Sequence, residues 1–265
     1  ETSLKSSCDV YYYDLALKVG IEKISAMSNR FGLGIKHDLA LSSVNSGLTP
    51  TKEWKLRQRG ADWVIGDTVN ASIGQGFMLA TPMQLAVMTA RLATGREVTP
   101  RLIKSVNGVE QPIKGNDPMD MRDANLRKMR KSMYAVVNDR RGTGYRSRII
   151  AEDMRMAGKT GTSQVRSAVV DNNSVPWEQR DHALFVGFAP YDNPRYACAV
   201  LVEHGGGGST AAAPIARDVM LQALYEGEPP LEAYPVGDRD RIKAQQEALR
   251  DVQPQARVKK GQDQA

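Results

Sequence analysis

The segment Lys159-Thr160-Gly161-Thr162 combines a cation, two hydroxyls and a glycine within a stretch that has strand-forming character, residues 154–165. The Lys159 ammonium can supply positive potential for a carboxylate and for proton transfer. Gly161 lets another backbone approach closely, and the hydroxyl that follows can bind a carboxylate. Taken alone, these residues fit an exposed strand with a surface lysine better than a site. The rest of the sequence must decide between the two interpretations.

Two nucleotide-binding motifs can be excluded at these glycines. A phosphate-binding loop ending in Gly158-Lys159-Thr160 requires a glycine where the sequence has Asp153. A dinucleotide fingerprint starting at Gly74 requires a glycine where the sequence has Leu79. The net charge of +6 gives little support to nucleic-acid binding, because lysines and arginines are interspersed with acidic residues.

A second polar segment, Ser6-Ser7-Cys8-Asp9, lies immediately before a helical pattern. Serine and aspartate at such a position can cap the helix, so capping and chemistry are both open here. Several longer segments accompany the two polar ones along the chain. They are GDTVNASIGQG at 66–76, TPMQLA at 81–86, AGKTGT at 157–162, HALFVGFAP at 182–190 and VEHGG at 202–206.

Together these segments resemble the class B penicillin-binding proteins over about Ser3 to Tyr225. Ser7-Cys8-Asp9 is similar to their second active-site motif, which is Ser-x-Asn in general and Ser-x-Asp in the penicillin-binding protein 2 group. The resemblance implies an α/β (α+β) transpeptidase fold of the serine β-lactamase-like type. In that fold an antiparallel sheet is flanked by helices, and the N-terminal part of the domain is expected to precede this sequence. No cofactor is implied.

The resemblance also implies roles for individual residues. Ser7 would pass protons during acylation and deacylation, and Lys159 would act beside it on the facing strand. The backbone N–H of Thr162 would be one donor to the oxyanion. The substrate-binding residues would be Asp9, Thr160, Gly161 and Thr162.

Two departures from the family pattern stand out. Asp9 replaces the commoner asparagine, so an amide that donates and accepts becomes an acceptor when ionised. The nucleophile motif Ser-x-x-Lys is absent, because no lysine in the chain has a serine three residues before it. The near matches Thr2 to Lys5 and Thr49 to Lys52 are interpreted as accidental. We expect the nucleophile before Glu1.

Metal and histidine chemistry are expected to play no part. Cys8 occupies a position where some related proteins hold zinc, but the partners would come from a preceding segment, so a buried free thiol is the better prediction. His182 and His204 flank strand candidates and are expected to make structural hydrogen bonds. His37 is expected on the surface.

Apolar periodicity predicts the elements that position the motifs. Helices are expected as two within 10–31 separated at Gly20, one from Thr81, one at 125–138, and one at 214–224 that buries Ile215, Val219, Leu221 and Leu224. Expected strands are a hairpin around Asn107-Gly108 and three adjacent antiparallel strands at 154–165, 183–189 and 196–202.

The composition suits one large globular unit, with 265 residues, 41% apolar and 25% charged. Residues 1–235 are predicted to form the C-terminal portion of a transpeptidase domain. Residues 236–265 are rich in Arg, Lys, Gln and Asp and are predicted to be a disordered tail, with a short helix around Ile242 to Leu249.

The expected function is peptidoglycan D,D-transpeptidation in cell elongation and cell shape, with β-lactam antibiotics as inhibitors. Expected partners are peptidoglycan stem peptides, a SEDS-family glycan polymerase and other elongation-complex proteins. The resemblance implies the periplasmic face of a bacterial inner membrane, with the anchor upstream of residue 1. The alternatives are a β-lactamase or D,D-carboxypeptidase of the same superfamily, or a non-catalytic penicillin-recognising sensor domain.

Overall fold

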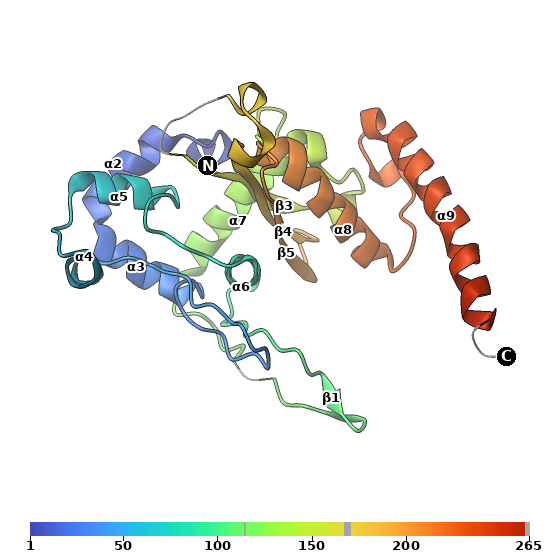
Figure 1. Cartoon of the computed structure of the whole chain (residues 1–265), viewed down its shortest axis with the longest axis horizontal. Coiled ribbons are helices and arrows are strands. Elements are labelled where there is room, and N and C mark those ends of the chain that lie inside the picture. Colours follow the sequence, from blue (N-terminus) through green and yellow to red (C-terminus); the bar gives the residue numbers. More distant parts are fainter. Residues whose placement is uncertain (114, 167–170, 263–265) are drawn as a thin grey trace.

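A three-stranded sheet lies between helices in the computed structural model, which describes residues 1–113, 115–166 and 171–262 (Figure 1). The helices are α1 (Thr2–Lys5), α2 (Asp9–Val19), α3 (Ile21–Arg30), α4 (Lys52–Arg59), α5 (Ile65–Ser72), α6 (Pro82–Thr94), α7 (Asp123–Asn138), α8 (Ala213–Tyr225) and α9 (Arg239–Gln262). The strands are β1 (Ser105–Val106), β2 (Val109–Glu110), β3 (Ala157–Ser163), β4 (His182–Ala189) and β5 (Tyr196–Val202). Single 3-10 turns occur at 145–147, 152–154, 172–174, 177–179, 231–233 and 236–238, and a π turn at 208–212. Within the described residues, no helix is long and apolar enough to cross a membrane.

The central sheet has the order β3-β4-β5, and both pairs are antiparallel, which confirms the three predicted strands. The first strand begins later than predicted, at Ala157, because residues 152–154 form a 3-10 turn. Lys159 lies opposite Val186. Since side chains alternate along a strand, Lys159 shares a face of the sheet with Phe188.

The two faces of the sheet bury different helices. On the Lys159 face, Ala157 and Phe188 pack with Ala93 of α6 and Met133 of α7. On the opposite face, Phe185 is 1% exposed and belongs to a larger core that includes α8. Figure 1 shows the sheet enclosed in this way between α7 and α8. Lys159 therefore lies on the face that is turned toward α6 and α7.

Helix α8 packs on the sheet as predicted, but the predicted buried side of this helix is partly wrong. Leu221 is fully buried and Leu224 is 5% exposed, whereas Ile215 and Val219 are 44% and 53% exposed. The buried side of this region also includes three small residues, Ala212, Ala213 and Ala216, together with Met220. Alanines let the helix approach the sheet closely, and an apolar pattern that counts only large residues misses this face.

The N-terminal helices confirm their sequence signals. Gly20 separates α2 from α3 with φ of 82°, a conformation that glycine adopts without strain. Helix α6 begins after Thr81 as predicted, and Thr81 and Gln84 form a capping box at its start. Gln84 is fully buried and donates from Nε2 to the carbonyls of Ile35 and Ser46, at 2.9 and 2.7 Å. The box therefore also anchors the long segment between α3 and α4.

The prediction of a surface position for His37 is wrong, because its side chain is only 6% exposed. His37 Nε2 donates to the carbonyl of Gly32 at 3.0 Å, so this ring nitrogen has a hydrogen-bond partner although the residue is buried. Burial lowers the pKa of His37 below 6.5, and the bond to Gly32 opposes that shift.

The hairpin predicted at Asn107-Gly108 is confirmed by the antiparallel pair β1-β2. Both turn residues have positive φ, 49° and 82°, as such a turn requires. The hairpin is short and exposed, and it extends away from the sheet (Figure 1). It therefore does not take part in positioning the motifs.

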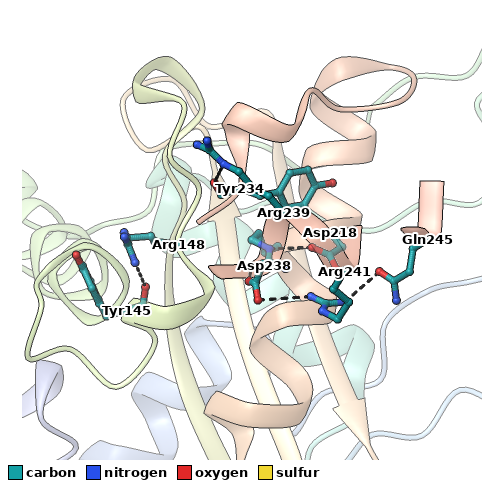
Figure 2. A network of polar contacts seen from close by, with 9 residues as sticks. Tyr145, Arg148, Asp218, Tyr234, Asp238, Arg239, Arg241 and Gln245 are labelled. Atoms are coloured by element: carbon teal, nitrogen blue, oxygen red, sulfur yellow. Dashed lines mark hydrogen bonds and ion pairs between the residues drawn. The ribbon is translucent and has the colours of Figure 1, made fainter. Parts of the chain in front are cut away.

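The C-terminal segment differs from the predicted disordered tail, since residues 239–262 form α9, which contains the short helix predicted around Ile242 to Leu249. Residues 263–265 lie outside the described residues. The first turns of α9 are held by packing and charge. Ile242 is 4% exposed in the main core, and the fully buried Arg217 of α8 donates to Asp218 and Asp238. Figure 2 shows Asp218 and Asp238 side by side in this network. The boundary of the domain at residue 235 remains a prediction.

Candidate active site

The hydroxyl of Ser7 and the ammonium of Lys159 meet although 152 residues separate them in the sequence. Lys159 Nζ donates to Ser7 Oγ, and it also donates to the carbonyl of Thr160 at 2.8 Å. The structure therefore places Lys159 beside Ser7, on the strand that faces it, as expected. The contact joins the loop before α2 to the edge strand β3.

Ser7 reaches β3 because of the turn between α1 and α2. Its φ is 50°, in the left-handed region that few residues other than glycine adopt. The turn is closed by Ser7 N donating to Leu4 O at 3.3 Å and Cys8 N donating to Ser3 O at 2.9 Å. Such backbone strain of about 1–3 kcal/mol persists where the surroundings fix it, and it is commonly found at functional sites.

The neighbours of Ser7 differ from two sequence predictions. Cys8 is exposed, so the predicted buried thiol is wrong. Asp9 is the first residue of α2, and the N-cap is Cys8, with no side-chain capping bond. The Asp9 carboxylate thus acts on the helix through its charge near the N-terminus rather than as a cap. Among the described residues, His, Cys, Asp and Glu form no cluster of three that could hold a metal.

Lys159 is half-buried, and its environment sets its protonation. Burial lowers the pKa of the Lys159 ammonium below 10.5, while the nearby Asp9 carboxylate opposes the shift. A buried ammonium with few water molecules exerts a stronger field on its neighbours than an exposed one. Asp9 therefore acts on Lys159 through charge, a link that the motif spacing alone does not reveal.

The remaining residues of the motif lie along β3. Thr160 Oγ1 is 2.8 Å from Thr143 Oγ1, in the loop after α7. The carbonyl of Thr162 accepts from Gln75 Nε2 at 2.9 Å. In an antiparallel strand the N–H and C=O of one residue point to the same edge. The N–H of Thr162 is therefore directed to the outer edge of β3, where Gln75 approaches.

Gly161 and Gly208 allow two backbones to come together at this strand. A Cβ on Gly208 would lie 2.3 Å from Gly161 O and 2.2 Å from Leu184 O, so no larger residue fits there. A Cβ on Gly161 would meet only Leu184 Cβ, at 3.4 Å. The π turn at 208–212 thus covers one side of Gly161, while space remains where a Cβ of this residue would lie.

The two histidines near the sheet make structural contacts, as predicted. His204 N donates to His182 Nδ1 at 2.9 Å, and His204 Nδ1 donates to Arg180 O at 2.9 Å. The two rings pack edge to face with centroids 4.7 Å apart, and Trp177 packs on His204 in the same way. They join the start of β4 to the end of β5.

Sequence reasoning missed three contributors to the site. Gln75 was visible only as part of the segment Gly74-Gln75-Gly76, and its contact with Thr162 depends on the fold. Thr143 lies between two glycines in Gly142-Thr143-Gly144, a signal of a tight loop but of no particular partner. The ion pair of Lys5 with Asp139 joins residues 134 apart, and neither residue lies in a recognisable motif.

Comparison with known proteins agrees with this geometry. Residues 1–221 match the family model for the penicillin binding protein transpeptidase domain. The chain is 36% identical over 258 residues to the peptidoglycan D,D-transpeptidase MrdA of Haemophilus influenzae, which covers 93% of this chain and 39% of that protein. It is 39% identical over 216 residues to MrdA of Acinetobacter baumannii, covering 78% of this chain and 32% of that protein.

Solved structures give the same result. The PBP2–MreC complex from Helicobacter pylori matches with a TM-score of 0.74 and 37% identity, over 85% of this chain and 39% of that one. Pseudomonas aeruginosa PBP2 in complex with WCK 5153 matches with a TM-score of 0.72 and 41% identity, over 84% and 46%. The chain thus spans less than half the length of these relatives. It belongs to the penicillin-binding protein transpeptidase domain family.

Proposed function

We propose that this chain supplies two of the three motifs of a peptidoglycan D,D-transpeptidase site, a serine acyl-transfer site that also reacts with penicillin. The observation that carries the proposal is the hydrogen bond from Lys159 Nζ to Ser7 Oγ, which joins the Ser-x-Asp and Lys-Thr-Gly segments. The relatives named D,D-transpeptidases support the same activity. The nucleophile is proposed to come from a Ser-x-x-Lys segment that this sequence does not contain.

In the proposed reaction, the nucleophilic serine attacks a D-alanyl carbonyl or a β-lactam carbonyl and forms an acyl-enzyme. The bond from that carbonyl carbon to the D-alanine nitrogen or the β-lactam ring nitrogen breaks, and Ser7 Oγ relays the proton lost by the nucleophilic serine to this nitrogen. D-alanine then leaves, whereas an opened β-lactam stays attached. Lys159 donates to Ser7, which keeps the Ser7 lone pairs and hydroxyl proton oriented for that transfer. A second substrate amine then takes the acyl group. Deacylation runs the proton transfer in reverse through Ser7.

Substrate binding is assigned to the outer edge of β3. The N–H of Thr162, directed to that edge, is a donor for the developing oxyanion. The hydroxyls of Thr160 and Thr162 and the charge of Lys159 suit the substrate carboxylate, and Gly161 leaves room for the peptide backbone. Asp9 completes the assignment by holding positive charge at Lys159.

The partners and the location of the protein are part of this proposal. We assign stem peptides as substrates and β-lactams as inhibitors. We further assign a SEDS-family glycan polymerase and other elongation-complex proteins as partners, at the periplasmic face of the inner membrane. Two solved relatives support this, one a complex of PBP2 with MreC and one a peptidoglycan synthase complex that joins polymerization and crosslinking.

Replacing each of two neighbouring serines by alanine, in a full-length protein that carries this sequence, tests the proposal. Ser7→Ala should slow acylation by fluorescent penicillin about 10²-fold or more, the usual contribution of a group that transfers protons. Ser6→Ala is the matched control, because Ser6 is exposed and the hydrogen bond from Lys159 goes to Ser7. Equal rates for the two variants would refute the role of Ser7. A wild-type product that is cross-linked peptide, rather than hydrolysed peptide or penicillin, separates a transpeptidase from a carboxypeptidase or β-lactamase.

A further inference from the structure

The loop of residues 139–144, which follows α7, touches both sides of the site. Lys5 Nζ donates to Asp139 Oδ2 at 2.8 Å, and Thr143 N points to Lys5 O at 3.4 Å. On the other side, Thr143 Oγ1 is 2.8 Å from Thr160 Oγ1. Since Lys5 lies two residues before Ser7, the loop connects the two catalytic segments by a route separate from the contact between Ser7 and Lys159.

The backbone of this loop has little freedom. The backbone N–H of Arg141 donates to Asp139 Oδ1, and that of Gly142 donates to the carbonyl of Asp139, both at 2.8 Å. Gly144 N donates to Val136 O at 2.9 Å. A Cβ at Gly142 would lie 2.2 Å from Val136 O, so only glycine allows the loop to pack on α7 at this distance. Thr143 is therefore held in position by the packing of its two neighbouring glycines against α7.

The ion pair is buried on the Lys5 side. The Lys5 side chain is 7% exposed and the Asp139 side chain 35% exposed. The hydrogen bond from Lys5 lowers the pKa of the Asp139 carboxyl, so this carboxylate stays ionised in the neutral range. A buried ammonium requires such a partner, because an unpaired charge away from water is strongly unfavourable. The pair thus fixes α1, and with it the turn that carries Ser7, to the C-terminal end of α7.

We infer that Thr143 is a positioning residue for Thr160, and that the Lys5–Asp139 pair holds Ser7 and β3 at their working separation through the same loop. The inference rests on the proposed function, because it assigns Thr160 to the substrate carboxylate. A threonine side chain has three staggered rotamers, and a hydroxyl partner at 2.8 Å selects one of them. Thr143 therefore orients the Thr160 hydroxyl before substrate arrives.

Thr143→Val tests the inference in the full-length protein, because valine keeps the shape and removes the hydroxyl. Acylation by fluorescent penicillin should slow about threefold to tenfold, the worth of one neutral hydrogen bond. Thr143→Ser should restore the rate. Thr49→Val is the matched control, because Thr49 is also a threonine whose hydroxyl bonds a side chain. Thr49 Oγ1 donates to Asn29 Oδ1 of α3 at 2.6 Å. The rate of Thr49→Val should equal that of the wild type.

A double-mutant cycle separates positioning from general destabilisation. If Thr143 acts through Thr160, Thr143→Val should have no further effect in a Thr160→Val background. Multiplying effects, or a Thr143→Val rate equal to wild type, would overturn the inference. Thr143→Ala replaces Thr143→Val should the latter unfold in a thermal scan. A wild-type protein that does not react with penicillin refutes the proposed function and the inference together, whereas a reactive wild type with an equally reactive Thr143→Val refutes the inference alone.

Discussion

Replacing Lys159 by methionine should slow acylation without destabilising the fold. The ammonium donates to Ser7 Oγ and to Thr160 O, and methionine keeps the unbranched apolar stem of the side chain while removing both bonds. A hydrogen bond to a charged group is worth about 1.5–3 kcal/mol, which corresponds to about 10- to 150-fold in rate. Loss of positive charge at the reacting centre brings the expected decrease to about 10²–10³-fold.

The free energy of unfolding of Lys159→Met, unlike its acylation rate, should not fall below that of the wild type. Burial lowers the pKa of Lys159, so the folded state disfavours the charged form. Between this lowered pKa and 10.5 the unfolded chain binds a proton that the folded chain does not, and the wild type therefore gains stability as the pH rises through that window. Below this pH window Lys159 is charged in both states, and the folded wild type bears the full free-energy cost of burying the ammonium. Lys159→Met should thus be at least as stable as the wild type at pH 7, and this advantage should shrink toward pH 10.5.

The assay is stopped-time labelling of the full-length protein with fluorescent penicillin, together with thermal scans at several pH values. Lys18→Met is the matched control, because the Lys18 side chain is 71% exposed and its ammonium donates to Asp14, one helical turn away, rather than to a residue of the site. The reasoning fails if Lys159→Met is acylated within about threefold of the wild-type rate, since one charged hydrogen bond alone accounts for more. A variant that is slow only because it is unfolded would also contradict it.

Three further predictions concern other parts of the chain. Residues 1–265 alone should form no covalent adduct with fluorescent penicillin, because the sequence lacks Ser-x-x-Lys; intact mass showing stoichiometric labelling, for instance at Thr49, would refute this. In the full-length protein, stability should fall as the pH drops below 6.5, because the unfolded chain takes up a proton at His37 before the folded one does; urea unfolding of His37→Asn should lack this component. Asp238→Ala should lower the free energy of unfolding in urea by about 1–2 kcal/mol, a loss that solvent keeps small because the Asp238 carboxylate is 31% exposed. This loss should exceed that of Arg217→Met, because Asp238→Ala leaves the buried charge of Arg217 in place, whereas Arg217→Met removes that charge as well. A more damaging Arg217→Met would contradict that order.

The elements that local chemistry specifies could be predicted from the sequence. The capping box at Thr81, the hairpin at Asn107-Gly108 and the break at Gly20 each depend on a few neighbouring residues, and the structure has all three. Short helices such as α4 and α5 were missed because eight residues carry too little periodicity. Helix α9 was predicted only around Ile242 to Leu249 because the rest of its pattern is polar, and its attachment depends on Ile242 and on a salt bridge to a distant helix.

The sequence by itself determined which residue types can do chemistry here and in what order they come: Ser7 with Asp9, then Lys159 with its threonines and glycine. Only the tertiary structure decided that Ser7 and Lys159 touch, that Asp9 acts on Lys159 through its charge, and that Thr143 meets Thr160. Burial, and hence the lowered pKa of Lys159, likewise belongs to the fold. The physical reason is range: capping and turn signals act over a few residues, whereas hydrogen bonds and desolvation act between side chains that packing brings together from any distance along the chain.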